Sequence, residues 1–261
     1  MFISTISESK YKTFKQCKLK YRYKYAERIP EQDKTNMYAL RFGSYIHKIL
    51  EDGVKATTMD ELNQIAEIEK PNYEFSKSYT PKIEKCLRNF LRFNASLNET
   101  VGTELTYEID LDEEKNIKQN GIIDRVVKGK DGGYLVIDYK TSKREKTKFD
   151  LYQDTQLKGY CYAIHKMYNV PIGNIVMAHY YPITDNFVHV SYTSSQIRAY
   201  TRTIIDEVWK IRKSKMVDLG PCRNEYCNWC AYKSLCPLFA DSRDIDKKIQ
   251  TIKEERKAKK L

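Results

Sequence analysis

The sequence lacks several features that would place it among membrane, secreted or motor proteins. No run approaches the roughly 18 apolar residues that span a bilayer. The first residues, MFISTISESKYKTFKQ, lack the apolar core of a signal peptide. No GxxxxGKS or GxxxxGKT phosphate loop is present, so the chain carries no helicase motor of its own. We therefore expect a protein of the reducing cytoplasm, with any motor supplied by a separate protein.

Acidic residues are too few to balance the basic ones. The chain holds 46 Lys and Arg against 35 Asp and Glu, a formal net charge of +11, which favours nucleic acid or an anionic membrane as partner. Residues 10–25, KYKTFKQCKLKYRYKY, hold seven basic and five aromatic residues and no acid. This segment is either a solvated surface helix with tyrosines in the core or a helix that contacts phosphates. Phosphate contact would use Lys10, Lys12, Lys15, Lys18, Lys20 and Arg22.

The hydrophobic period changes from helical to strand-like and back. Helices are expected from an N-cap at Ser7 to about Tyr25 and over residues 36–56 (with Leu40 on its apolar stripe), 59–69 and 80–96. Strands are expected at 102–111, 117–128 and 133–141, separated by turn signals. A helix at 151–169, strands at 174–182 and 186–193 and a helix at 196–216 follow. This order predicts an α/β fold with a mixed sheet, helices on both faces and a helical crossover between the third and fourth strands.

Two carboxylates follow apolar runs that a hairpin can bring together. Asp124 lies in GIIDRVV and Asp138 in LVIDYK, so both can converge on one sheet edge. Two carboxylates, water and a phosphate oxygen give the hard oxygen ligands that Mg²⁺ or Mn²⁺ prefers, and the backbone carbonyl of Tyr139 can add another. Lys140 shares a strand face with Asp138 and can orient a water or stabilise phosphate charge. The alternative is an ordinary strand end with a surface ion pair.

The ordered motifs resemble the PD-(D/E)XK nuclease superfamily, in particular its RecB-like branch. GIIDRVV and LVIDYKTSK carry the resemblance, although Ile123 stands where proline is common. RFGSYIHKILE is similar to the G-x-x-x-H helix of these enzymes, and TQLKGYCYA to their Q-x-x-x-Y helix. The resemblance implies a restriction-endonuclease-like core with metal ligand His47 and catalytic residues Asp124, Asp138, Lys140, Gln156 and Tyr160. The residues alone leave His47 and Tyr160 as possible core side chains and Gln156 as a surface amide.

Seven cysteines in a reducing compartment are expected to be metal ligands and core residues. Three of them fall in CNWCAYKSLCP, where C-x₂-C is typical of thiolate metal sites. Cys222 could complete a local zinc site. AddB-like and CRISPR-adaptation-type nucleases, which the chain resembles, imply instead a [4Fe–4S] cluster held by Cys17, Cys227, Cys230 and Cys236. Cys86 and Cys161 lie in apolar helical patterns and are expected in the core.

The resemblance covers residues 4–239 and implies one nuclease domain over 1–240. Within it, segments 1–30 and 218–240 would be tied by the cluster, and residues 241–261 would form a charged helix or tail. The implied activity is a Mg²⁺- or Mn²⁺-dependent deoxyribonuclease, usually an exonuclease on single strands or duplex ends. The implied setting is recombination, repair, replication or CRISPR adaptation, with a separate helicase, annealing protein or integrase and without a membrane. Two alternatives are a non-catalytic nucleic-acid-binding protein with structural zinc or iron–sulfur, and a thiolate-rich redox protein.

Overall fold

The computed structural model describes residues 3–32, 37–142 and 144–258, which divide into two units. The central unit is Met37–Ile205, and the terminal unit joins Met1–Asn36 to Asp206–Leu261. Residue 36 of the predicted second helix and residues 259–261 of the predicted tail lie outside the described residues. The prediction of one nuclease domain over residues 1–240 stays a prediction. None of the described helices combines the length and apolarity that a membrane crossing needs.

The central unit contains a mixed sheet, as predicted. Strands β2 to β6 lie side by side in chain order. The β2–β3, β3–β4 and β5–β6 pairs are antiparallel, and β4–β5 is parallel with Tyr134 opposite Ile175. A parallel pair needs a crossover connection, which helices α6 and α7 provide. The strand bounds are β2 (Thr100–Asp112), β3 (Ile117–Lys128), β4 (Tyr134–Tyr139), β5 (Ile175–Tyr181) and β6 (Asn186–Ser191).

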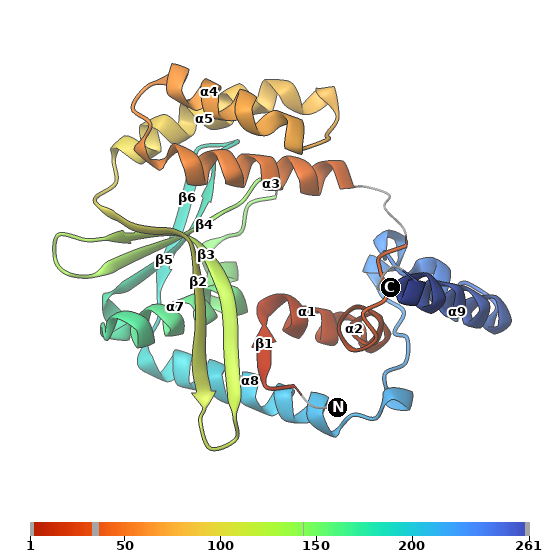
Figure 1. Cartoon of the computed structure of the whole chain (residues 1–261). Helices are drawn as coiled ribbons and strands as arrows, with labels where there is room; N and C mark the ends of the chain where they lie inside the picture. Colours follow the sequence, from red (N-terminus) through yellow and green to blue (C-terminus); the bar gives the residue numbers. More distant parts are fainter. Residues whose placement is uncertain (1–2, 33–36, 143, 259–261) are drawn as a thin grey trace. The chain divides into compact units, whose positions relative to one another are not determined.

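Helices cover both faces of this sheet (Figure 1). On one face lie α3 (Met37–Asp52), α4 (Met59–Glu69) and α5 (Thr80–Ala95). On the other lie α6 (Lys148–Gln153) and α7 (Thr155–Tyr168), with the first part of α8 (Ser194–Lys213). Helix α3 buries residues spaced by three and four, the stripe expected of a helix with one apolar face: Phe42, Tyr45, Ile46, Ile49 and Leu50. Leu40, predicted on that stripe, is instead 67% exposed, because it lies beside the stripe rather than under it.

Two predicted helices are interrupted by residues with extended backbone. The helix expected at 151–169 is divided at Asp154, whose side chain accepts the N–H groups of Gln156 and Leu157 and so caps α7. The helix expected from Ser7 to about Tyr25 is divided at Cys17, with φ −162° and ψ 118°. The Ser7 cap itself is confirmed, since its hydroxyl accepts the N–H of Lys10 at 3.3 Å.

The terminal unit is built from short elements around a small core. The strand β1 (Thr5–Ser7), helices α1 (Glu8–Gln16) and α2 (Lys18–Tyr21) and a π turn (Arg22–Ala26) are followed, after α8, by short 3-10 turns and helix α9 (Ser242–Ala258). Leu19, Tyr23 and Ile29 pack against Tyr232 and Leu235 from the cysteine-rich segment. This core joins the two ends of the chain.

The start of the parallel β4–β5 pair depends on a glycine. A methyl group at Gly133 would lie 2.7 Å from the backbone carbonyl oxygen of Asn174, which cannot rotate away as a side chain would. We expect Gly133→Ala to lower the free energy of unfolding by about 1–3 kcal/mol, because overpacking forces a backbone shift. Urea denaturation of both variants measures this, with Gly173→Ala as the control, since a methyl group there meets nothing within 4 Å. Equal stability of the two variants would contradict the prediction.

Candidate active site

A cavity of about 570 Å³ opens in the central unit beside the α3 helix and the end of β4. Helix α3 contributes His47 and Gly43, the β2–β3 ladder contributes Glu104 and Asp124, and the residues after β4 contribute Lys140 and Thr141. Gly43 and His47 are four residues apart and therefore lie on the same side of α3. A methyl group at Gly43 would approach the Thr141 hydroxyl to 3.0 Å, so the glycine allows the chain to pass close to the helix.

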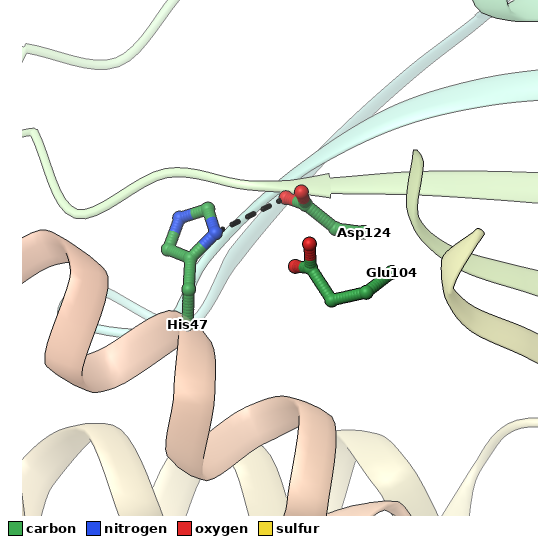
Figure 2. A group of neighbouring side chains, drawn as sticks. All are labelled: His47, Glu104 and Asp124. Carbon is green, nitrogen blue, oxygen red and sulfur yellow. Dashed lines mark ion pairs between the residues drawn. The ribbon is translucent and has the colours of Figure 1, made fainter. Parts of the chain in front are cut away.

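Three side chains in this cavity form a group suited to a divalent cation. One ligand atom from each of His47, Glu104 and Asp124 lies within 4.8 Å of the others. The Nδ1 atom of His47 is 3.4 Å from the Oδ2 atom of Asp124. Figure 2 shows the imidazole and both carboxylates pointing toward one another from three different elements. Two carboxylates and an imidazole suit Mn²⁺, and the oxygens alone suit Mg²⁺, so the residues fit the ion that the sequence motifs imply.

Glu104 was not predicted as a site residue. The pairing of Thr103 with Arg125 and of Leu105 with Ile123 places Glu104 opposite Asp124. Its φ of 44° lies in the left-handed region, which costs a residue with a Cβ on the order of 1–3 kcal/mol. Such strain is typical of functional positions. The sequence GTELTYE carries no signal for this, because the role of Glu104 depends on strand register and on a local backbone irregularity.

Asp124 lies inside β3, which has the bounds expected from the sequence. Its Oδ2 atom accepts the backbone N–H of Tyr139 at 2.7 Å, which ties it to the end of β4. Burial and the nearby charge of Asp138 raise its pKa well above the ordinary carboxyl value. Burial also lowers the pKa of His47, so this imidazole is neutral at pH 7 and can act as a ligand. Tyr139 lines the cavity, and metal ligation by its carbonyl stays a prediction.

Asp138 occupies a different environment from Asp124. It is 2% exposed, forms an ion pair with Lys140, and lies 3.2 Å from the Nε2 atom of His179. Burial alone would raise its pKa, but Lys140 and His179 outweigh this and hold the pKa of Asp138 below its usual value. His179, fully buried in β5 directly opposite Asp138, was not predicted. Metal ligation by Asp138 stays a prediction, because the three-residue group at the cavity does not include it.

Lys140 lines the cavity and carries a positive charge. Burial disfavours its ammonium form, but Asp138 reverses the effect and raises the pKa of Lys140 above its ordinary value. A lysine that keeps its proton acts through charge and hydrogen bonding, not as a general base.

Gln156 and Tyr160 stand behind Asp138 on α7. The Nε2 atom of Gln156 donates to the Tyr160 hydroxyl at 2.7 Å and lies 3.4 Å from the Oδ1 atom of Asp138. Burial, followed by the charges of Asp138 and Asp124, raises the pKa of Tyr160. Among the residues described, neither side chain lines the cavity. Their arrangement holds Asp138 in place, and direct contact with substrate stays a prediction.

The cysteines of the terminal unit lie around one small cavity. Cys17, Cys222, Cys227, Cys230 and Cys236 all line it, and Cys222 is exposed whereas the other four are half-buried. Thiolates on one zinc ion lie about 3.8 Å apart, from a Zn–S bond of about 2.3 Å. In the described part of the chain, His47, Glu104 and Asp124 form the only group of three or more His, Cys, Asp or Glu residues whose ligand atoms lie within 4.8 Å of one another, so no three thiols lie that close. Which of these thiols bind a metal ion or an iron–sulfur cluster stays a prediction.

The basic side chains predicted to contact nucleic acid are partly neutralised within the terminal unit. Lys12 pairs with Glu8 at 3.1 Å, Lys15 with Glu207 at 3.5 Å, and Arg22 with Glu27. The remaining three make neutral contacts: Lys10 with the Thr5 carbonyl, Lys20 with Gln16, and Lys18 with the Phe14 ring. Glu8 and Glu27, which flank residues 10–25, and Glu207 from α8 thus supply negative charge that the segment lacks. Phosphate contact by these basic residues stays a prediction.

With this geometry established, comparison with known proteins identifies the family. The sequence pattern of the PD-(D/E)XK nuclease superfamily matches residues 5–237. The chain therefore belongs to the PD-(D/E)XK nuclease superfamily.

The relatives and the fold agree with this membership. One subunit of the ATP-dependent helicase/deoxyribonuclease of Streptococcus agalactiae serotype Ia, and its counterpart in serotype V, are each 30% identical to this chain over 161 residues. The match covers 56% of this chain and only 14% of the relatives. A crystal structure described as an exonuclease of Eubacterium rectale has a similar fold, with a TM-score of 0.56 at 15% identity over 88% of both chains.

The raised pKa of Asp124 makes metal binding pH-dependent. An ion that binds the carboxylate must displace its proton, so Mn²⁺ affinity is expected to rise with pH above the ordinary carboxyl value of 3.8 and to level off above the raised pKa. Below that pKa, Asp124 itself contributes about one released proton per bound ion. Calorimetry of Mn²⁺ binding in buffers of different ionisation enthalpy counts the protons released. Asp124→Asn should bind Mn²⁺ weakly and release fewer protons, and the remaining pH dependence comes from Glu104, whose pKa burial also raises. A flat wild-type profile would show that Asp124 is already ionised.

Proposed function

We propose that this protein is a metal-dependent DNA nuclease that acts as an exonuclease on single strands or duplex ends. The grouping of His47, Glu104 and Asp124 in an open cavity beside the ammonium of Lys140 carries the proposal. Family membership supports cleavage of a phosphodiester, and the net charge of +11 supports a nucleic-acid substrate.

Each group has a distinct part in the proposed hydrolysis. His47, Glu104 and Asp124 would hold Mg²⁺ or Mn²⁺, which when bound supplies Lewis acidity toward a phosphoryl oxygen and lowers the pKa of water. Lys140 stabilises the negative charge that develops on the phosphate as water adds and the P–O ester bond breaks. Asp138 and His179 keep Lys140 in position, and Gln156 and Tyr160 position Asp138 in turn.

A partner protein is part of the proposal. Similar relatives are named as subunits of a helicase/deoxyribonuclease, but this chain spans 14% of their length. We propose that a separate helicase, annealing protein or integrase works with this nuclease in recombination, repair, replication or CRISPR adaptation.

We also propose that Cys17, Cys227, Cys230 and Cys236 hold a [4Fe–4S] cluster. Four half-buried thiols around one cavity support this, and the exposed Cys222 is the alternative fourth ligand. A cluster that joins Cys17 to Cys227 closes a loop of about 210 residues. The chain entropy that the unfolded state loses by this closure corresponds to a stabilisation of about 5 kcal/mol. The cluster would therefore be structural, joining the two chain ends of the terminal unit.

Cleavage of end-labelled DNA tests the nuclease proposal. Single- and double-stranded DNA labelled at the 5′ or the 3′ end should be degraded with Mg²⁺ or Mn²⁺ and remain intact in EDTA. Lys140→Ala is expected to slow cleavage by about 100-fold or more, because a charge at the reacting phosphate is lost. Glu104→Gln should slow cleavage and weaken Mn²⁺ binding.

Lys166→Ala, on an exposed turn of α7 outside the cavity, is the charge-matched control and should cleave at the wild-type rate. Undiminished cleavage by Lys140→Ala, or cleavage in EDTA, would overturn the mechanism. Binding of DNA without cleavage by the wild type would favour a non-catalytic binding protein.

Iron content tests the cluster. Protein purified without oxygen should contain iron and sulfide and absorb visible light, and Cys17→Ala should lose the iron and become less stable. Cys222→Ala should retain both, because its thiol is not needed. A stable, iron-replete Cys17→Ala protein beside an iron-free Cys222→Ala protein would assign the fourth ligand to Cys222.

A further inference from the structure

A second cavity of the central unit has the opposite charge from the first. It has a volume of about 480 Å³ and is lined by residues that follow α3 and α5 and by residues at the start of β2. Lys55 and Arg125 are its charged residues, and among the described residues that line it there is no Asp or Glu. The candidate active site, in contrast, is lined by three acids, Glu51, Glu104 and Asp124, against two lysines, Lys48 and Lys140.

Arg125 is the unusual member of this lining. It is only 2% exposed, although a charge this buried normally pairs with a carboxylate. Its Nε and Nη2 atoms donate to the Thr100 hydroxyl at 3.0 and 2.7 Å, and its Nη1 atom donates to the Tyr139 hydroxyl at 3.4 Å. All of these acceptors are neutral. Within the described part of the chain no ion pair compensates the guanidinium, which keeps further N–H donors on its Nη atoms.

The surroundings of Arg125 suit a tetrahedral oxyanion. A guanidinium offers phosphate a planar, bidentate donor set, and the exposed ammonium of Lys55 adds a second charge across the same cavity. Hydroxyl and amide groups of Thr100, Thr103 and Asn98 supply neutral donors. A cavity of 480 Å³ is many times the roughly 30 Å³ that one water occupies in the liquid, so it has room for a phosphate group.

The ladder between β2 and β3 links the two cavities. Arg125 is paired with Thr103, and the next rung places Asp124 opposite Glu104. Neighbouring residues of a strand point to opposite faces of the sheet, so Asp124 and Arg125 line different cavities although they are consecutive in β3. Glu51 of the first cavity and Lys55 of the second are four residues apart where α3 ends, which is about one helical turn, so a strand bound at the first cavity would bring a further phosphate toward the second.

We propose that the cavity around Arg125 and Lys55 binds a phosphate group of the DNA strand, separate from the phosphate at the candidate active site. The inference rests on the proposed function in taking DNA as the source of the phosphate. Free inorganic phosphate offers the same chemistry, so the test has to separate the two.

Salt dependence of DNA binding is the first measurement. A labelled single strand is titrated with protein in EDTA, which prevents cleavage, at several NaCl concentrations. Each phosphate contact contributes about 0.7 to the slope of log K against log salt for a single strand. Lys55→Ala should reduce the slope by about 0.7, and Arg125→Lys, which keeps the charge but loses the fork, should weaken binding with little change in slope. Lys166→Ala is the charge-matched control and should leave the slope unchanged.

Inorganic phosphate is the second measurement. Wild-type thermal stability is compared in phosphate and in chloride at equal ionic strength, beside Lys55→Ala. Stabilisation by phosphate with an unchanged DNA slope in Lys55→Ala would overturn the DNA assignment in favour of a free anion. No effect of Lys55→Ala in either measurement would overturn the site altogether and leave Arg125 a structural residue.

The two proposals fail separately. Wild-type protein that cleaves DNA while Lys55→Ala keeps the full salt slope would retain the nuclease function and lose the second phosphate site. Protein that cleaves nothing, but whose salt slope falls in Lys55→Ala, would retain the phosphate site and lose the nuclease function. Lys55 is exposed, so its replacement is not expected to prevent folding.

Discussion

The cost of burying two neighbouring carboxylates, together with the repulsion between them, is the main constraint on this site. Asp124 and Asp138 come from neighbouring strands, and each raises the cost of ionising the other. The two carboxylates have different surroundings. Asp138 is given an ammonium and an imidazole and stays ionised, whereas Asp124 faces an open cavity with Glu104 and a neutral His47. Among the described residues, Asp124 has no positively charged partner comparable to Lys140, and a bound divalent cation would supply that positive charge.

Much of the fold could be predicted because it depends on periodicity. The order of helices and strands, the mixed sheet and the helices on both faces follow from apolar patterns that dominate local structure. The breaks at Cys17 and Asp154 could not be predicted from apolar patterns, because a single residue with extended backbone leaves the pattern on either side unchanged. The Asp154 cap, an acid two residues before Gln156, was the available signal.

Site residues that follow an apolar run in the sequence could be predicted. Site residues whose position depends on the pairing register between strands could not. Asp124, Asp138 and Lys140 follow runs that mark strands, and the hairpin brings them together. Glu104 and His179 reach the same place only through pairing with Asp124 and Asp138 across two strand interfaces. A one-residue slip would turn either side chain to the other face of the sheet, so no local sequence pattern could assign them. The same alternation of side chains turns Arg125 away from Asp124 and toward the second cavity.

The left-handed backbone of Glu104 has a consequence for how this protein can change. Glycine adopts that conformation without strain, so a glycine here would make the metal-free chain more stable while removing a carboxylate from the cavity. At residue 104 the choice that favours folding stability therefore differs from the choice that provides a metal ligand. A chain that lost its need for a metal ion would be expected to drift toward glycine or asparagine at residue 104, and the persistence of glutamate there would mark a lineage still selected for cation binding.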